Sequence, residues 1–401
     1  MYGQRRLVSR RNQRSLRPPG RHRLGRFGYP PLIPLLVRHG WFTAAQADYL
    51  GAFNLAGYVA GSAAAGILAH RLRVSLSVRL AMLTVAAGFV ACAWPLGFTW
   101  FVFWRLSAGI AGGVLMVIGA PSVLSSIPTA IRGRIGGIVF TGVGAGMALS
   151  GTVIPIFASW GLRQAWLSLG ISAGLLTMFA WRGWCADETR SGESETSDRA
   201  NPPEKLPPLE RRLSWLLFWL LAAYVTNAIG FVPHTVFWVD YIARGLGRGI
   251  ATGNHYWVLL GISAAVGPLA SGWLADRFGF SRSLRGSLFA KAIGVALPLF
   301  STSPLALALS SVGVGSMAIG IVSLAAGRVA ELVPASRQKQ VWSWMTAAFA
   351  IAHAATAFVL SAIFARTGSY RILFMIGSVA LLIGCVFDFI SSGAKPDGAV
   401  R

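Results

Sequence analysis

The chain is built from apolar runs that are each long enough to cross a lipid bilayer. A membrane-spanning helix needs roughly 17–25 mostly apolar residues, because the hydrocarbon core is about 30 Å thick. We find eleven such runs, separated by polar or charged breaks. They predict an all-α, polytopic membrane protein. The predicted spans are 49–69, 76–96, 100–124, 135–159, 165–181, 213–239, 256–275, 287–301, 305–326, 341–364 and 372–390.

A net charge of +23 is typical of nucleic-acid-binding proteins. The distribution of the basic residues along the chain indicates a different role. With a cytoplasmic N-terminus, 29 of the 36 Lys and Arg fall at cytoplasmic positions, including four in the stretch 277–291. Six more Lys and Arg residues fall at positions predicted to lie outside the membrane. This bias predicts a protein of the cell inner (plasma) membrane with both termini in the cytoplasm. No groove-reading element accompanies the basic residues, so a nucleic-acid partner is not expected.

A long polar break divides the chain into two halves. Residues 183–212 hold seven of the thirteen acids and four prolines, which is typical of a flexible linker. The segments 61–79 and 267–285 lie 206 residues apart and share nine of nineteen residues. A repeat that keeps the same orientation requires an even number of helices in each half. We therefore expect two six-helix bundles, residues 25–182 and 213–391, with a C-terminal tail at 392–401.

The first helix of the first bundle is expected to be incomplete. Nine arginines lie between Arg5 and Arg26, and residues 1–24 are predicted to form a basic, disordered arm outside the hydrocarbon core. The apolar part that follows is only 27–37. Eleven residues at 1.5 Å each span about half of the bilayer core. A lost or replaced upstream segment, a native half-crossing and a transit peptide are the alternatives.

Two six-helix halves joined by a long central loop resemble the major facilitator superfamily, and in particular its YbfB/YjiJ-type transporters. The stretches that carry the resemblance are "GRFGYPPLIPLL" (25–36), "YLGAFNLAGYVAG" (49–61), "RLSAGIAGGVLMV" (105–117), "GIVFTGVGAGMALSGTVIP" (137–155), "AYVTNAIGFVPHTVF" (223–237) and "MTAAFAIAH" (345–353). The resemblance implies alternating access, with two halves rocking about a central site. Family members carry an apolar half-helix where this chain has "PPGRHRL".

Ionisable and polar groups inside the predicted spans are candidates for substrate or proton binding, because they are costly in a bilayer. Arg105 heads an RxxxG pattern that resembles a helix-4 motif linked to proton transfer in antiporters. The alternative role is an anchor at the outer interface. Tyr224, Asn227 and His234 follow one helical face of the seventh helix and are candidates for substrate contact, or for hydrogen bonding between helices. His353 is a further candidate, with packing as its alternative.

Two further patterns predict gating and close packing. The first is the superfamily loop pattern G-x-x-x-D-R-x-G, expected to close the cytoplasmic side or simply to cap the helix. It is formed by Gly272, Asp276, Arg277, Gly279 and Arg282. The second is a small-xxx-small spacing, which lets helix backbones approach closely. It is formed by Gly109 and Gly113 on one helix and by Gly142 and Gly146 on another.

These features predict a secondary active transporter of small molecules. We expect it to be coupled to protons and to favour neutral or anionic substrates. No carboxylate lies in the middle of a predicted helix to meet a cationic drug. The expected partners are a small-molecule substrate, protons and the bilayer, with the protein a monomer that carries no cofactor or metal. A non-transporting remnant with a broken first helix is one alternative. A polytopic membrane enzyme is the other, although no catalytic grouping can be assembled from the sequence.

Overall fold

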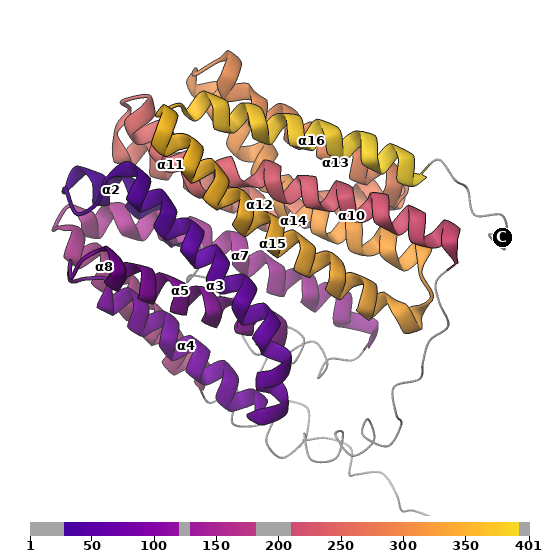
Figure 1. Ribbon diagram of the computed structural model, residues 1–401, viewed down its shortest axis with the longest axis horizontal. Coiled ribbons are helices and arrows are strands. Elements are labelled where there is room, and N and C mark those ends of the chain that lie inside the picture. Colours follow the sequence, from indigo (N-terminus) through magenta and orange to yellow (C-terminus); the bar gives the residue numbers. More distant parts are fainter. Residues whose placement is uncertain (1–27, 120–128, 182–209, 393–401) are drawn as a thin grey trace, which may run out of the picture.

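Figure 1 shows the computed structural model of the protein, which describes residues 28–119, 129–181 and 210–392. Within these residues there is no β-strand. Nine of the helices found there are long and apolar enough to cross a membrane. The predicted all-α, polytopic class is therefore confirmed. The predicted basic arm, most of the linker and the C-terminal tail lie outside the described residues.

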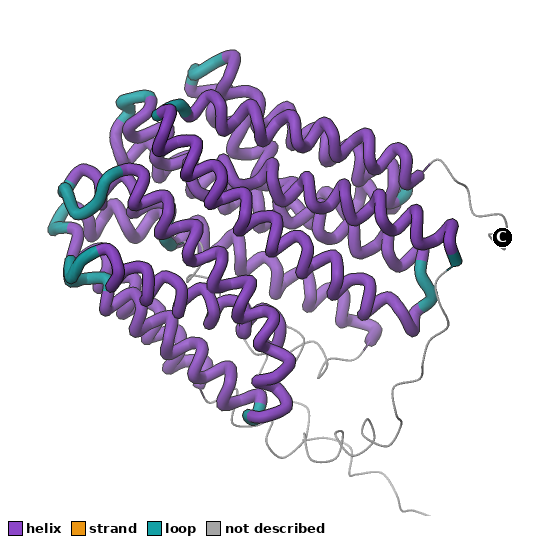
Figure 2. Tube along the Cα trace, viewed as in Figure 1, coloured by secondary structure: helices purple, strands orange, loops and turns teal. Residues whose placement is uncertain are grey.

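The first half of the chain follows the predicted spans. Its elements are η1 (Pro30–Leu32), α2 (Ile33–Arg38), α3 (Ala44–Arg71), α4 (Val74–Ala91), α5 (Phe98–Val114), η2 (Leu115–Gly119), α7 (Thr129–Ala158) and α8 (Leu162–Trp181). The loops between consecutive helices lie at two opposite ends of the bundle (Figure 2). This arrangement is the one that a bilayer requires, because unpaired backbone groups are costly in the hydrocarbon core.

The second half contains longer helices. They are α10 (Arg211–Val232), η4 (Pro233–Phe237), α11 (Trp238–Asp240), η5 (Tyr241–Gly245), α12 (Gly249–Phe278), α13 (Phe280–Phe300), α14 (Pro304–Leu332), α15 (Ala335–Thr367) and α16 (Tyr370–Ser392). The segment from α10 to η5 is a continuous span, and its η4 and η5 portions are π-helical. Such local widening of a helix is frequent at functional sites.

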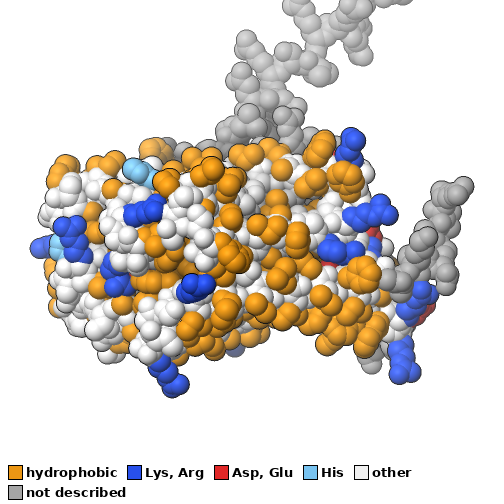
Figure 3. Space-filling view, turned by 90° about the horizontal axis from the view of Figure 1, so that it is seen from above, with side chains coloured by type: hydrophobic (Ala, Val, Ile, Leu, Met, Phe, Trp, Pro, Cys, Tyr) orange, Lys and Arg blue, Asp and Glu red, His pale blue; other side chains and the backbone are white. Residues whose placement is uncertain are grey.

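The outer face of the helices is apolar. In Figure 3, hydrophobic side chains cover the middle of the visible face and Lys and Arg lie toward its two ends. Large side chains such as Phe103, Leu269 and Phe389 are more than half exposed on the membrane helices. An apolar surface of this extent fits a lipid environment. The charge distribution along the helices agrees with a transmembrane placement.

The helix pairing of the first half is repeated in the second. The pairs α3–α5, α4–α5 and α4–α8 correspond to α12–α14, α13–α14 and α13–α16. The repeat extends to single atoms. A Cβ on Gly109 would lie 2.1 Å from the Asn54 carbonyl oxygen, and 206 residues later a Cβ on Gly315 would lie 2.4 Å from the Leu260 carbonyl oxygen. Helices that approach this closely accept only glycine at the contact.

Two pairs of long helices join the halves. The helix α3 lies beside α15 (Figure 1), and α7 lies beside α12. The rings of Phe53 and Phe358 meet edge to face at 5.2 Å across the first pair. In the second pair, a Cβ on Gly144 would lie 2.3 Å from the Gly261 carbonyl oxygen. The two halves therefore meet along two tight seams.

The short segment η1–α2 lies inside the protein. Leu32, Ile33 and Leu36 are fully buried, and Tyr29 just before them is 1% exposed. The segment contacts α3 on its own side and α11 on the other half. It therefore places Tyr29 at the junction between the two halves.

Candidate functional site

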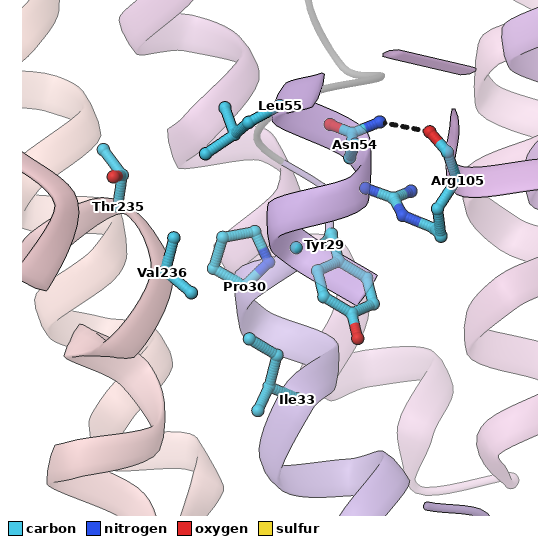
Figure 4. Close-up of a pocket in the computed structure, with 9 residues that line it drawn as sticks. Tyr29, Pro30, Ile33, Asn54, Leu55, Arg105, Thr235 and Val236 are labelled. Atoms are coloured by element: carbon cyan, nitrogen blue, oxygen red, sulfur yellow. Dashed lines mark hydrogen bonds between the residues drawn. The ribbon is translucent and has the colours of Figure 1, made fainter. Parts of the chain in front are cut away.

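A small cavity lies at the junction of the two halves, as Figure 4 shows. It is lined from the first half by η1 with its preceding Tyr29, by α2, α3 and α5, and from the second half by η4. The lining residues are Tyr29, Pro30, Ile33, Gly51, Asn54, Leu55, Arg105, Thr235 and Val236. Its free volume is about 20 Å³, which admits about one water molecule. A larger ligand would need the halves to move apart.

Arg105 is the one charged residue that lines this cavity. It lies in α5 and is 2% exposed. Its Nε and one Nη have no hydrogen-bond acceptor among the described residues. Its guanidinium carbon lies 4.4 Å from the centre of the Tyr29 ring. A buried guanidinium with free N–H groups is costly unless an anion completes it.

Two contacts fix the walls beside Arg105. The Asn54 side-chain amide donates to the Arg105 carbonyl oxygen at 2.8 Å, which ties α3 to α5 (Figure 4). The Tyr29 hydroxyl donates to the Ala47 carbonyl oxygen at 2.6 Å. Both Asn54 and Tyr29 therefore use their polar groups on backbone atoms. The guanidinium is left with the aromatic face as its main neighbour.

A second charged group lies at the N-terminal end of α3. Asp48 and Asp240 are both fully buried and within electrostatic range of each other. Asp240, in α11, accepts hydrogen bonds from Arg244 and from the Tyr370 hydroxyl. Neither carboxylate oxygen of Asp48 has a hydrogen-bond partner among the described residues. Sequence position places both acids near helix ends but does not reveal that they are enclosed together.

The predicted polar stripe, which runs along α10 and into η4, faces the interior of the second half. The Asn227 side-chain oxygen accepts a hydrogen bond of 2.8 Å from the Lys291 ammonium. His234 contacts the Ser310 hydroxyl at 2.9 Å, and that hydroxyl donates to the Gly294 carbonyl oxygen. Tyr224 packs against the rings of Trp342 and Phe349. Neither Tyr224 and Asn227 of α10 nor His234 of η4 lines the cavity around Arg105.

Lys291 was expected among the cytoplasmic basic residues, and this placement is wrong. It lies in the middle of α13, fully buried, with its ammonium 4.1 Å from the centre of the Phe231 ring. Its only hydrogen bond within the described residues is the one to Asn227. The signal was present in the sequence, because Lys291 falls inside a predicted apolar span. An ionisable residue within such a span is a functional candidate by default.

His353 connects α15 to the cavity wall. Its Nδ1 lies 2.9 Å from the Ala228 carbonyl oxygen, so this nitrogen carries the hydrogen. Its Nε2 lies 3.3 Å from the hydroxyl of Thr235, one of the cavity-lining residues. The His353 ring also stacks on Phe349 at 5.7 Å. His353 therefore does not line the cavity, but it contacts Thr235, which does.

The loop pattern lies at the turn between α12 and α13. Gly279 ends α12 with φ of 81°, in the left-handed region that favours glycine. Gly272, Asp276, Arg277 and Arg282 are all exposed. The Arg277 guanidinium lies 5.9 Å from the Trp273 ring centre. These residues surround a turn at the end of the second half that is opposite η5.

Of the four glycines predicted to pack closely, two make backbone contacts shorter than a side chain permits. Gly109 meets Asn54, and a Cβ on Gly113 would lie 2.4 Å from the Tyr58 carbonyl oxygen. Gly142 and Gly146 are buried in α7. Gly144 is the closer approach: a Cβ there would lie 2.3 Å from the Gly261 carbonyl oxygen.

Tyr29, Asn54 and Asp48 were not recognised as site residues. Tyr29 belongs to a segment whose burial depends on contacts with α3 and α11, which periodicity does not encode. Asp48 falls just before the predicted span 49–69, and the sequence places it at an outer helix end without indicating that it is buried. Within the described residues, no group of three His, Cys, Asp or Glu side chains is placed to hold a metal ion.

The fold and the enclosed junction define a membrane transporter of the major facilitator type. A family model described as "Uncharacterised MFS-type transporter YbfB" matches residues 23–389, and the chain belongs to this family. The resemblance found in the sequence is thereby confirmed. The family and its relatives are transporters of small molecules, and this multi-pass membrane protein shares their fold.

Two curated relatives and one solved structure illustrate the similarity. The uncharacterized MFS-type transporter YcaD of Escherichia fergusonii is 24% identical over 73% of this chain and 74% of that protein. The gentisate transporter of Corynebacterium glutamicum is 22% identical over 79% of this chain and 72% of that protein. The crystal structure of a D-xylose-proton symporter has a TM-score of 0.68 at 19% identity, covering 93% of this chain and 97% of that one. That last likeness concerns the fold alone.

Proposed function

We propose that the protein carries small organic anions across the membrane by alternating access, with Arg105 binding the substrate carboxylate. A guanidinium matches a carboxylate in a planar, two-bond geometry, which an ammonium cannot reproduce. The observation that carries this proposal is the buried position of Arg105 at the junction of the halves, with two of its guanidinium nitrogens lacking acceptors among the described residues.

A positively charged site selects against cations. No carboxylate lines the cavity, and the nearest aromatic face, Tyr29, already faces the Arg105 guanidinium. A cationic drug would therefore meet repulsion there without a compensating group. Neutral substrates remain compatible, because Asn54 and Thr235 supply hydrogen-bonding side chains next to the cavity. Anions are favoured, since only they offset the buried charge.

The gentisate transporter among the relatives is named for an aromatic carboxylate, which suits an arginine beside a tyrosine ring. A substrate of that kind would exchange the Arg105–Tyr29 contact for a salt bridge and a ring contact. We therefore choose gentisate as the first probe.

The inner membrane is the expected location, with both termini in the cytoplasm, as the distribution of basic residues indicates.

Transport requires the cavity to open on each side in turn. Its 20 Å³ volume is too small for an organic acid in the closed arrangement. The seams α3–α15 and α7–α12 are the surfaces about which the halves would rock. The exposed charged turn at Asp276 and Arg277 would change its contacts in the cytoplasmic opening. Tyr224, Asn227 and His234 would support the second half rather than touch the substrate, while His353 would hold Thr235.

Coupling to protons is favoured over coupling to Na⁺. A sodium site needs several oxygen ligands around one point. Asp240 is already engaged by Arg244 and Tyr370, so it is not available as a metal ligand. A single buried carboxylate such as Asp48 can bind a proton without further ligands, whereas it cannot form a sodium site alone.

Uptake into proteoliposomes tests the proposed function. Purified protein would be tested with labelled gentisate, with xylose as a neutral probe and with tetraphenylphosphonium as a lipophilic cation, under an inward proton gradient. We expect accumulation of gentisate above protein-free vesicles, little xylose and no cation. Uptake of the cation without gentisate would contradict the proposal. Uptake of none of the probes would favour the non-transporting alternative.

A further inference from the structure

Asp48 is enclosed in an unusual way for an acidic side chain. It is fully buried, and neither of its oxygens has a hydrogen-bond partner among the described residues. At the start of α3, the amides of Thr43 and Gln46 are used in a reciprocal cap and do not donate to Asp48. An ionised carboxylate without donors is costly to bury. The enclosure is compatible with a neutral acid that holds its own proton.

The groups that face Asp48 come from both halves. Asp240 of α11 and Arg244 of η5 lie within electrostatic range, and they form an ion pair with each other that Tyr370 of α16 completes. Arg244 is thus committed to Asp240. On the first half, Tyr29 lies near both acids and near Arg105. Within the described residues, neither Asp48 oxygen accepts a hydrogen bond from a cationic side chain.

Asp48 also lies next to the cavity. It is one helical turn from Gly51, which lines the cavity, and Tyr29 is in electrostatic range of both Asp48 and Arg105. Arg105 thus has donors without acceptors, and Asp48 has acceptors without donors. The Tyr29 side chain, fixed to the carbonyl of Ala47, stands beside both. Arg105 lines the cavity itself, whereas Asp48 lies outside its lining.

We propose that Asp48 is the proton-binding residue that couples transport to the proton gradient, an inference that rests on the transport proposed above. When the contact of α2 and η1 with α11 opens, an external water-borne proton bonds to a carboxylate oxygen of Asp48. Closure of that contact encloses the neutral acid beside Asp240. When the cavity opens and hydrates on the cytoplasmic side, the carboxyl O–H bond breaks and the proton passes to water.

Infrared spectroscopy tests the proton site without any substrate. The purified protein at neutral pH should show the carbonyl stretch of a protonated, weakly hydrogen-bonded carboxylic acid. Asp48→Asn should remove this band, whereas Asp388→Asn should retain it, because Asp388 is held by Arg285 at 3.2 Å. Persistence of the band in Asp48→Asn would overturn the assignment, as would its absence from the wild-type protein.

A transport assay then separates coupling from substrate movement. In proteoliposomes, Asp48→Asn should lose proton-driven accumulation of gentisate by about tenfold or more, while exchange of internal for external gentisate without a gradient continues. Equal losses of accumulation and exchange would reduce Asp48 to a structural residue. If the wild-type protein moves no gentisate at all, the proposed substrate fails. The infrared result still decides whether Asp48 holds a proton.

Discussion

The guanidinium of Arg105 lies 4.4 Å from the centre of the Tyr29 ring, and this contact joins α5 to the segment that precedes η1. An aromatic face attracts a cation but cannot accept two planar hydrogen bonds. Arg105 is therefore stabilised in the closed arrangement and still able to bind a carboxylate. The contact explains how a buried arginine is tolerated without a permanent counterion.

Replacing Tyr29 separates its two contributions. Tyr29→Phe keeps the ring under Arg105 and loses only the hydrogen bond to the Ala47 carbonyl, so a loss of about 1 kcal/mol is expected. Tyr29→Ala also removes the ring from a buried site, which costs about 3–5 kcal/mol. Thermal unfolding in detergent should therefore show a much lower midpoint for the alanine variant. Equal midpoints would contradict the role of the ring.

The Lys291–Asn227 pair predicts an asymmetry between single and double replacements. Asn227→Leu leaves a buried ammonium with no hydrogen-bond acceptor among the described residues, which should cost about 2–3 kcal/mol. Lys291→Met combined with Asn227→Leu removes both polar groups and should be less destabilising than Asn227→Leu alone. Unfolding midpoints of the two variants provide the measurement. A double variant that is less stable than the single one would show that the ammonium has another partner.

The backbone contact of α3 with α5 predicts that Gly109 tolerates no side chain. In Gly109→Ala the new methyl group would lie 2.1 Å from the Asn54 carbonyl oxygen, so the helices must separate. Overpacking of this kind costs about 1–3 kcal/mol. Gly286→Ala is the matched control, because nothing lies within 4 Å of a Cβ there. We expect a lower unfolding midpoint only for Gly109→Ala, and a similar loss in both would contradict the contact.

The orientation follows from charge placement and has its own test. The turn around Gly247, between η5 and α12, should face the outside, and the turn around Gly279 should face the cytoplasm. A single cysteine at each position, in a background without the native cysteines, would be exposed to a membrane-impermeant thiol reagent in intact cells. Labelling at position 247 and protection at 279 are expected. The reverse pattern would overturn the charge-based orientation.

The fold was predictable from the sequence because its main determinant is local. Apolar runs of bilayer length give the helices, and the 206-residue repeat gives the equivalence of the halves. The equivalent contacts of Gly109 with Asn54 and of Gly315 with Leu260 show that this repeat reaches the packing. The helices depend on residues close together in sequence, and the equivalence of the halves depends on the fixed 206-residue spacing of the repeat.

The site was only partly predictable, because it depends on contacts between distant segments. Arg105 stood out as a charge inside an apolar run. Tyr29 and Asp48 did not, since their burial results from η1–α2 and α11 closing over them. Lys291 lies in a basic stretch, and its position inside the predicted span 287–301 is what distinguishes it from the cytoplasmic residues beside it.

The most direct test of the account is gentisate uptake by proteoliposomes that contain Arg105→Gln, with Arg105→Lys and Arg163→Gln beside it. Arg163 is exposed and lies over the Trp94 ring, so its replacement should leave uptake within about twofold of the wild type. Arg105→Gln should reduce uptake by about tenfold or more, and Arg105→Lys should restore part of it, because an ammonium keeps the charge without the two-bond geometry. Wild-type uptake by the Arg105→Gln protein, at equal amounts in the vesicles, would contradict the assignment of Arg105 as the substrate-binding group.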